Sequence, residues 1–259
     1  MTVNTQPDSF SKYNMYTCTS FAATPEILAI RETAYSLIGS LSGQPSIDCS
    51  NELPITPDLS YRVASSPEFL RVYYHLILRL KTIFNNEFSF QKFPTLRLLN
   101  KNDIGHRFHV DTWAGYDPSI FTFWAPLSSF SPSSCLHLLS GEASQAALSQ
   151  FTSHGLTLNE FSLLASPKSA PPTINLGDLV CFGSHIVHGS NSFDDVPHRI
   201  SIDFRLWDVF SQKQMIAQQL TTEKDNWRRI SHVISDIIYQ RITGESGYFD
   251  SRIVYISES

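Results

Sequence analysis

The middle of the chain is a succession of short strand-like segments. From Phe93 to Asp208, apolar or alternating runs are separated by turn residues, a pattern typical of strands rather than helices. The eight expected strands are 95–99, 108–112, 119–127, 135–139, 173–176, 179–182, 185–188 and 199–207. Eight strands at such spacing predict a mainly β fold with flanking helices, a double-stranded β-helix of the jelly-roll or cupin-like kind.

Helical patterns flank this β region. The motif Thr-Pro-Glu at 24–26 places a proline and an acid in a first helical turn, and Ser-Pro-Glu at 66–68 repeats the signal. A third apolar stripe at helical spacing ends at Gly244. Inside the β region we expect a short helical insert near 142–150 and a Ser/Pro-rich loop at 162–172.

The 259 residues are expected to form a single domain (1–259), because β barrels of this length are commonly one domain. We divide it into an N-terminal arm with helices (1–92), the β core (93–208) and C-terminal helices (209–259). The first two dozen residues are polar and unpatterned, so we expect them to be loosely ordered.

Composition and charge bear on the partners and on the surroundings of the protein. A formal net charge of −5 gives no reason to expect nucleic acid or an anionic membrane. The four cysteines include no CxxC pair, which fits a reducing cytoplasm better than a disulfide framework. No secretory signal and no run of ~18 apolar residues is present, so the sequence predicts a cytoplasmic protein without a membrane span.

Two histidines and one aspartate have the spacing of metal ligands. In a strand, His109 and Asp111 would point to the same side, and His188 follows 77 residues after Asp111 on a later strand. Two imidazoles and one carboxylate on one face of Fe(II) leave three coordination positions open. The HxD string alone is a weak signal, because an isolated histidine is commonly a structural residue.

The run HRISIDFRLWD alternates strictly between polar and apolar residues. The polar members are Arg199, Ser201, Asp203 and Arg205, and the apolar members are Ile200, Ile202, Phe204 and Leu206. Such a polar face lies either in water, as on an exposed edge strand, or in a polar cavity, where an arginine would bind a dicarboxylate. Arg205, next to Asp203 on that face, is better placed for an internal ion pair.

The order of these motifs resembles a known family. HVD, then GDLVCFGSHIVHGS, then PHRIS is similar to the Fe(II)/2-oxoglutarate-dependent dioxygenases, and FHVDTW, FWAPLSS and CLHLLSGE to their phytanoyl-CoA-dioxygenase-like branch. The match covers roughly residues 94–207. It implies that His109, Asp111 and His188 hold Fe(II), that Arg199 and Ser201 bind the distal carboxylate of 2-oxoglutarate, and that O₂ is the oxidant.

The sequence departs from that pattern around the expected substrate pocket. Many family members carry HGSxxN, whereas here Ser190 is followed at once by Asn191. Leu-Ser-Gly-Glu at 139–142 replaces a Pro-Gly-Ser-His segment, and this second departure indicates a different wall around the substrate. The segment 152–172 and the loop after Trp113 are long for a compact barrel, so we expect lids there.

Several further residues are candidates for the site. Trp113, beside the metal motif, is a candidate for the substrate pocket, and so is Arg97, whose alternative is an exposed strand position. His106 and His185 each stand three residues before a proposed ligand, so on strands they would point away from it.

By this resemblance the protein would be an oxidoreductase that hydroxylates a small metabolite of a specialised biosynthetic pathway, with succinate and CO₂ as co-products. Because residue 111 is Asp and not Gly or Ala, no coordination site remains for halide, and hydroxylation is favoured over halogenation. Two alternatives remain: a non-catalytic cupin-like binding protein, and a zinc-dependent hydrolase on the same triad, in which the arginine-bearing strand has no role.

Overall fold

The computed structural model describes residues 14–44, 47, 50–84, 88–208, 231–236, 239 and 246. The chain divides into two compact units, Met1–Ser211 and Gln212–Ser259, and every element labelled below belongs to the first. In the second unit, residues 231–236 are helical, and most of the helical region predicted for 209–259 lies outside the described residues. The single-domain organisation therefore stays a prediction.

The first unit is built on an antiparallel sheet of six strands. Its order is β1 (Cys18–Ala22), β6 (Asp178–Gly183), β4 (Phe121–Pro126), β8 (His198–Asp208) and β2 (Phe88–Phe90), and β3 (Thr95–Asn100) also pairs with β8. The long strand β8 is therefore central. It pairs with β4 along one side, and along its other side it pairs first with β3 and then with β2.

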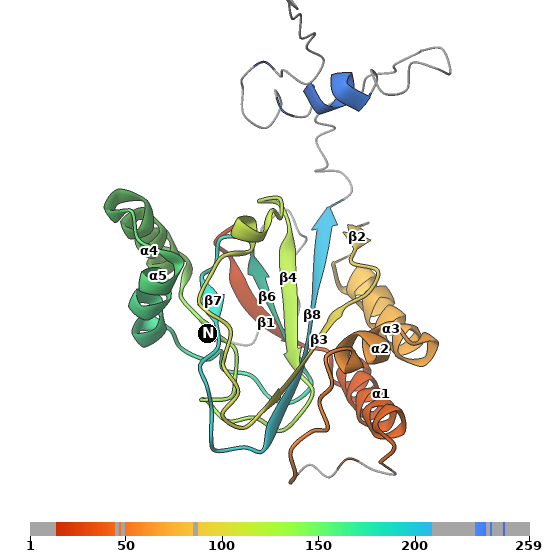
Figure 1. Ribbon diagram of the computed structural model, residues 1–259. Coiled ribbons are helices and arrows are strands. Elements are labelled where there is room, and N and C mark those ends of the chain that lie inside the picture. The colour runs from red at the N-terminus through yellow and green to blue at the C-terminus, as the bar shows by residue number, and fades with distance from the viewer. Residues whose placement is uncertain are drawn as a thin grey trace, which may run out of the picture. The chain divides into compact units, whose positions relative to one another are not determined.

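A second, two-stranded sheet joins β5 (His137–Leu138) to β7 (His188–Gly189). It is extended by an isolated bridge between His109 and His188. The predicted class, mainly β with flanking helices, is confirmed, and the strands of the main sheet are antiparallel (Figure 1).

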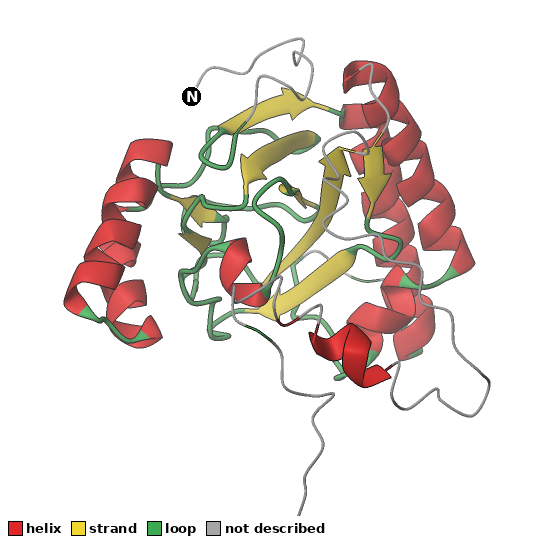
Figure 2. Ribbon diagram, turned by 90° about the horizontal axis from the view of Figure 1, so that it is seen from above, coloured by secondary structure: helices red, strands yellow, loops and turns green. Residues whose placement is uncertain are grey.

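Helices cover the sheets from two sides. The helices α1 (Thr24–Ser42), α2 (Leu59–Ala64) and α3 (Pro67–Phe84) lie beside the main sheet, and α4 (Gly141–His154) and α5 (Leu158–Ala165) lie on the opposite side, beyond β7 (Figures 1 and 2). The helix starts predicted at 24–26 and 66–68 are confirmed, and the short helix α2 lies between these two helices in the chain.

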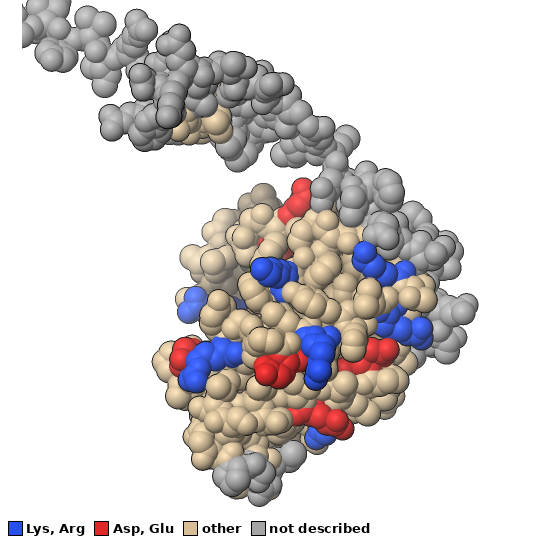
Figure 3. Space-filling model, turned by 90° about the vertical axis from the view of Figure 1, so that its right-hand side faces the viewer, with Lys and Arg blue, Asp and Glu red and all other residues tan. Residues whose placement is uncertain are grey.

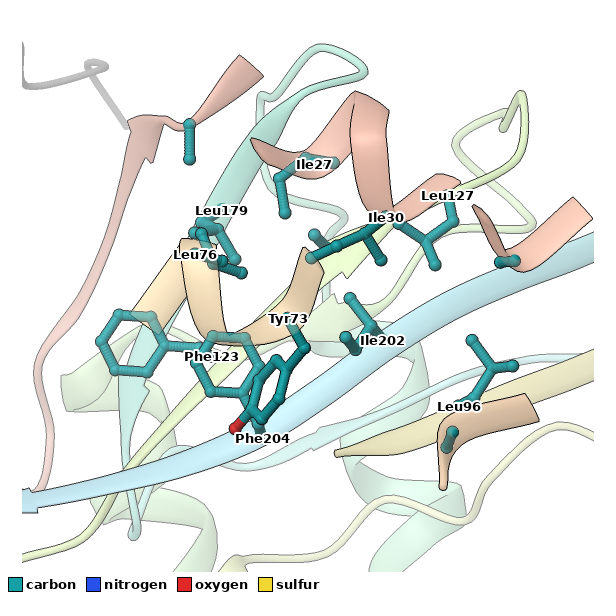
Figure 4. Close-up of a cluster of buried hydrophobic side chains, with 14 of the residues drawn as sticks. Ile27, Ile30, Tyr73, Leu76, Leu96, Phe123, Leu127, Leu179, Ile202 and Phe204 are labelled. Atoms are coloured by element: carbon teal, nitrogen blue, oxygen red, sulfur yellow. The ribbon is translucent and has the colours of Figure 1, made fainter. Parts of the chain in front are cut away.

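The apolar core lies between the main sheet and α1–α3 (Figure 4). Phe204 of β8 stacks on Phe123 of β4 at 5.4 Å between ring centroids and meets Tyr73 of α3 edge-on at 5.3 Å. Successive residues of a strand point to opposite faces, so burying this apolar set forces the polar set of β8 onto the other face of the sheet. That face carries the candidate site.

Three expectations about local structure are wrong. Residues 18–22, expected to be loosely ordered, form β1 and pair with β6. Residues 173–176 are not a strand. The segment 152–172, expected to be a long loop, contains the end of α4, then α5 and a 3-10 turn, η3 (Ser166–Lys168). A capping box of Thr157 and Glu160 begins α5 and stabilises a helix in a Ser/Pro-rich region.

The described residues contain no helix long and apolar enough to cross a membrane. On the face formed by α1–α3, basic and acidic side chains are mixed, and neither sign gathers into a patch (Figure 3).

Candidate metal centre

The structure brings the three predicted ligands together. His109, Asp111 and His188 each offer one ligand atom, and these atoms lie within 4.8 Å of one another. The two imidazole centroids are 4.4 Å apart, and Oδ1 of Asp111 lies 3.9 Å from Nε2 of His188. Two imidazoles and a carboxylate at this spacing could hold a divalent transition-metal ion.

A backbone bridge brings the two histidines side by side. The N–H of His109 donates to the carbonyl of His188 at 2.9 Å, and the N–H of His188 donates back at 3.0 Å. The strand predicted over 108–112 is reduced to this bridge, because Asp111 begins a 3-10 helix, η2 (Asp111–Ala114). Val110 between them is extended and buried, so His109 and Asp111 still share one side.

Both histidines are oriented through the same ring nitrogen. Nδ1 of His109 lies 2.7 Å from the carbonyl of Arg107, and Nδ1 of His188 lies 2.9 Å from the carbonyl of Ile186. A carbonyl only accepts, so Nδ1 carries the proton in each ring and Nε2 keeps its lone pair for a metal.

Electrostatics keep the ligands in their metal-binding forms. Burial lowers the pKa of His188 to about 4 and leaves its imidazole neutral at neutral pH. Burial by itself raises the pKa of Asp111, but His188, Arg205 and the hydroxyl of Thr122 outweigh it and hold that pKa below its usual range. A neutral imidazole and an ionised carboxylate are the forms that bind metal.

The polar face of β8 forms one wall of a cavity at this cluster. Arg97, Arg199, Asp203 and Arg205 give it charge, and Trp124, Leu136 and Phe182 form an apolar wall. Arg199, Asp203 and Arg205 are at most 7% exposed, and β8 is paired on both edges. The alternative of an exposed edge strand with solvated charges is therefore wrong.

Arg199 is a buried cation with unused hydrogen-bonding capacity. Its Nη1 donates to the carbonyl of Ser134 at 3.2 Å and its Nη2 to the hydroxyl of Ser190 at 3.4 Å. Its Nε and the buried Oγ of Ser201 have no hydrogen-bond partner, and no ion pair among the described residues includes Arg199. Buried donors without partners are costly, so this end of the cavity suits an anion.

The other arginine of β8 is already occupied. Nη1 of Arg205 lies 2.6 Å from Oδ2 of Asp203, and its Nη2 lies 3.4 Å from Oδ1 of Asp111. Asp203 also receives Nε of Arg97 at 2.8 Å. Nε of Arg205, like that of Arg199, has no hydrogen-bond partner, but both Nη atoms of Arg205 lie on carboxylates. Of the two arginines on β8, Arg199 is therefore the one with no ion pair among the described residues.

One cavity residue was assigned wrongly from the sequence. His106 was expected to point away from the site, yet it lines the cavity and its Nε2 contacts Nη1 of Arg97. The segment before Phe108 is irregular, so the alternation rule for strands does not apply to it. Arg97 does reach the cavity, and nothing in the local spacing indicated that His106 would join it.

Trp113 lies outside the metal cavity. It packs on Phe151 and Phe161 at 4.7 and 4.9 Å between centroids and borders a separate groove of about 610 Å³ between η2 and α4. His185 borders the same groove beside Tyr16, so it points away from the metal cluster as predicted. The substrate role of Trp113 stays a prediction, now tied to this groove.

No family model matches the sequence. Among solved structures, EvdMO1 shares the fold with a TM-score of 0.52 and 16% identity over 78% of this chain, which spans about half (49%) of EvdMO1. HygX from Streptomyces hygroscopicus, with nickel and 2-oxoglutarate bound, has a TM-score of 0.49 and 15% identity. The match covers 76% of this chain and 84% of the HygX chain. EctD from S. alaskensis with bound Fe has a TM-score of 0.48 and 13% identity. The match covers 78% of this chain and 76% of the EctD chain.

The likeness to EvdMO1 is one of fold alone, and it agrees with the predicted jelly-roll, cupin-like class. In this chain, the His109–Asp111–His188 cluster could hold a metal ion.

Proposed function

We propose that this chain is an Fe(II)- and 2-oxoglutarate-dependent oxygenase that hydroxylates a small molecule. One observation carries the proposal: a buried His–Asp–His cluster shares a cavity with Arg199, a buried cation that lacks an acidic partner among the described residues. A metal ion and a guanidinium without an acidic partner in one cavity suit a dicarboxylate that chelates the metal.

His109, Asp111 and His188 would hold the iron. With 2-oxoglutarate bound, Fe(II) supplies the activation of O₂ that oxidises the substrate and yields succinate and CO₂. The protein provides the ligand set, and three ligands on one face leave positions for co-substrate and O₂. With Asp111 as a ligand, no coordination position would remain for a halide, which favours hydroxylation over halogenation.

Arg199 and Ser201 would bind the distal carboxylate of 2-oxoglutarate. Both are on the cavity face of β8, and both have buried donors without a partner: Nε of Arg199 and the hydroxyl of Ser201. An arginine and a hydroxyl together give a carboxylate charge-assisted hydrogen bonds. The pKa of Arg199, lowered to about 10 by burial and by Arg97, still leaves the guanidinium charged at neutral pH.

The apolar wall completes the arrangement. Trp124, Leu136 and Phe182 line the cavity together with the charged residues, and Trp124 pairs across the strands with Asp203. Excluding water there strengthens the ion pairs and protects reactive species from solvent. The substrate we expect is a small metabolite of a specialised pathway, handled in the cytoplasm.

Two alternatives are less well supported. A zinc-dependent hydrolase on the same triad gives no role to the unpartnered donors of Arg199 and Ser201. A non-catalytic binding protein would use the same cavity and differs only in lacking turnover.

The test is a succinate-release screen. Purified protein with Fe(II), ascorbate and 2-oxoglutarate is incubated with fractionated metabolite pools, and Asp111→Ala is the control. We expect at least one fraction to raise succinate above the uncoupled background in the wild type alone. Binding of Fe(II) and 2-oxoglutarate without succinate from any pool would favour the binding protein. Zinc in the isolated protein, with no affinity for 2-oxoglutarate, would favour the hydrolase.

A further inference from the structure

Among the described residues, Arg205 is the arginine whose guanidinium contacts one of the three candidate metal ligands, Asp111. Its guanidinium bridges two carboxylates, with Nη2 at 3.4 Å from Oδ1 of Asp111 and Nη1 at 2.6 Å from Oδ2 of Asp203. The residue is 7% exposed and belongs to the central strand β8. The guanidinium is therefore part of the wall behind the candidate metal site.

Neighbouring groups hold Arg205 in this position. Asp203 is itself held from the far side by Arg97, whose Nε lies 2.8 Å from Oδ1. The ring of Tyr116 lies 4.8 Å from the guanidinium carbon of Arg205. Cross-strand pairing of Thr122 with Arg205 places these two residues side by side on β4 and β8. A side chain held by an ion pair and an aromatic face has little freedom to move.

The two oxygens of Asp111 are held differently. Oδ2 accepts a hydrogen bond from the hydroxyl of Thr122. Oδ1 is the oxygen that faces Nε2 of His188, at 3.9 Å, and it is the oxygen that Arg205 contacts. Thr122 and Arg205 together therefore fix the rotation of the carboxylate, with Oδ1 toward the histidines and Oδ2 turned to β4.

We propose that Arg205 is a positioning residue of the metal centre, which holds Oδ1 of Asp111 toward His109 and His188 so that Asp111 binds through one oxygen. This inference rests on the proposed function in one respect, since it takes Asp111 as a metal ligand. It assigns Arg205 a role different from that of Arg199, which binds the co-substrate from the same strand.

The direction in which metal affinity changes distinguishes an arginine that orients a ligand from one that only contributes charge. A cation beside a metal site repels a divalent ion, so removing a guanidinium that acted only as a charge would tighten metal binding. Removing a partner that orients a ligand weakens metal binding, typically by about 10- to 100-fold. The two roles therefore predict opposite changes in metal affinity.

The experiment titrates the chelator-treated full-length chain with Co(II) and follows the visible d–d absorption, without 2-oxoglutarate or substrate. The variants are Arg205→Met, Arg205→Lys and Asp111→Ala. Arg62→Met is the matched control, because Arg62 is a half-exposed arginine of α2 whose partner is Asp58. We expect Arg205→Met to weaken Co(II) binding about 10- to 100-fold and to change the band shape, with the control unchanged.

Lysine keeps the charge of Arg205 but cannot bridge two carboxylates as a planar fork does. Arg205→Lys should therefore also weaken binding, and it decides the question if Arg205→Met fails to fold by circular dichroism. Wild-type affinity and spectrum in Arg205→Lys, or wild-type or tighter binding in Arg205→Met, would overturn the inference. Unchanged binding in Asp111→Ala would instead overturn the metal site, and the proposed function with it.

Discussion

His109 and His188 are joined by two backbone hydrogen bonds of 2.9 and 3.0 Å, although 79 residues separate them in the chain. This bridge sets the 4.4 Å spacing of their rings. The two imidazoles therefore keep their relative position through the main chain, and Asp111 is brought in by the turn that follows directly. Any change that separates the two segments should disturb the metal site.

Gly189, beside His188, tests this dependence. A methyl group there would lie 2.9 Å from the carbonyl oxygen of His106 and 2.9 Å from Cα of Phe108, in the segment that leads to His109. Gly189→Ala should push the two segments apart, destabilise the protein by about 1–3 kcal/mol and weaken metal binding. Chemical denaturation and Co(II) titration measure both effects. Wild-type values for stability and affinity together would contradict the expected crowding.

Asp111→Ala should remove the charged ligand and sharply lower the iron occupancy of the purified protein. The fold should survive, because Arg205 keeps its shorter ion pair, with Asp203. Metal content by mass spectrometry and circular dichroism measure the two outcomes. A variant that still turned over 2-oxoglutarate at the wild-type rate would show that the triad is assigned wrongly.

Arg199→Ala should raise the KM for 2-oxoglutarate with the metal still bound. Loss of a buried charge-assisted contact costs on the order of 2–5 kcal/mol, much of it from the carboxylate left unpaired. Steady-state kinetics measure KM, and the iron content of each variant is measured in parallel. The control is Arg62→Ala, which changes a half-exposed arginine of α2. If Arg205→Ala rather than Arg199→Ala raised KM, the co-substrate site would have to move along β8.

The stability of the metal-free protein should fall in mild acid. The pKa of His188 is lowered to about 4 in the folded chain and is about 6.5 when unfolded. Between these two pH values the unfolded chain binds more protons at this histidine than the folded chain does. The free energy of unfolding should therefore decrease by on the order of 3 kcal/mol as the pH falls from 7 toward 4. Denaturation at pH 7 and pH 5 after chelation measures the slope, which should be shallower in His188→Gln. An equal slope in that variant would remove His188 as the cause.

The loop after Trp113 stays a candidate lid, whereas 152–172 is largely helical. Tyr116 in that loop is 36% exposed and lies over Arg205 in the cavity wall. We expect 2-oxoglutarate with Fe(II) to slow chymotryptic cleavage after Tyr116, and cleavage after the exposed Tyr61 of α2 to be unaffected. Equal cleavage after Tyr116 with and without ligands would exclude a closing loop.

Much of the fold follows from local pattern. The alternation over β8 fixes which residues are buried against α1–α3 and which face the cavity, because side chains on a strand alternate between two faces. Pro25 and Pro67 identify the starts of α1 and α3 for an equally local reason. Strand β1 was missed because its pairing with β6, some 160 residues away, is what stabilises it.

The sequence by itself determined the residue types of the site: two histidines and an aspartate at ligand spacing, and an arginine on an alternating strand. Only the tertiary structure decided which charges meet. Arg205 contacts Asp111, and His106 contacts Arg97 at the cavity. Arg199 lies by Ser134 and Ser190, without an acidic partner in the part of the chain that the structure describes. These pairings span tens of residues and depend on how β3, β4 and β8 align, whereas local spacing constrains only near neighbours along the chain.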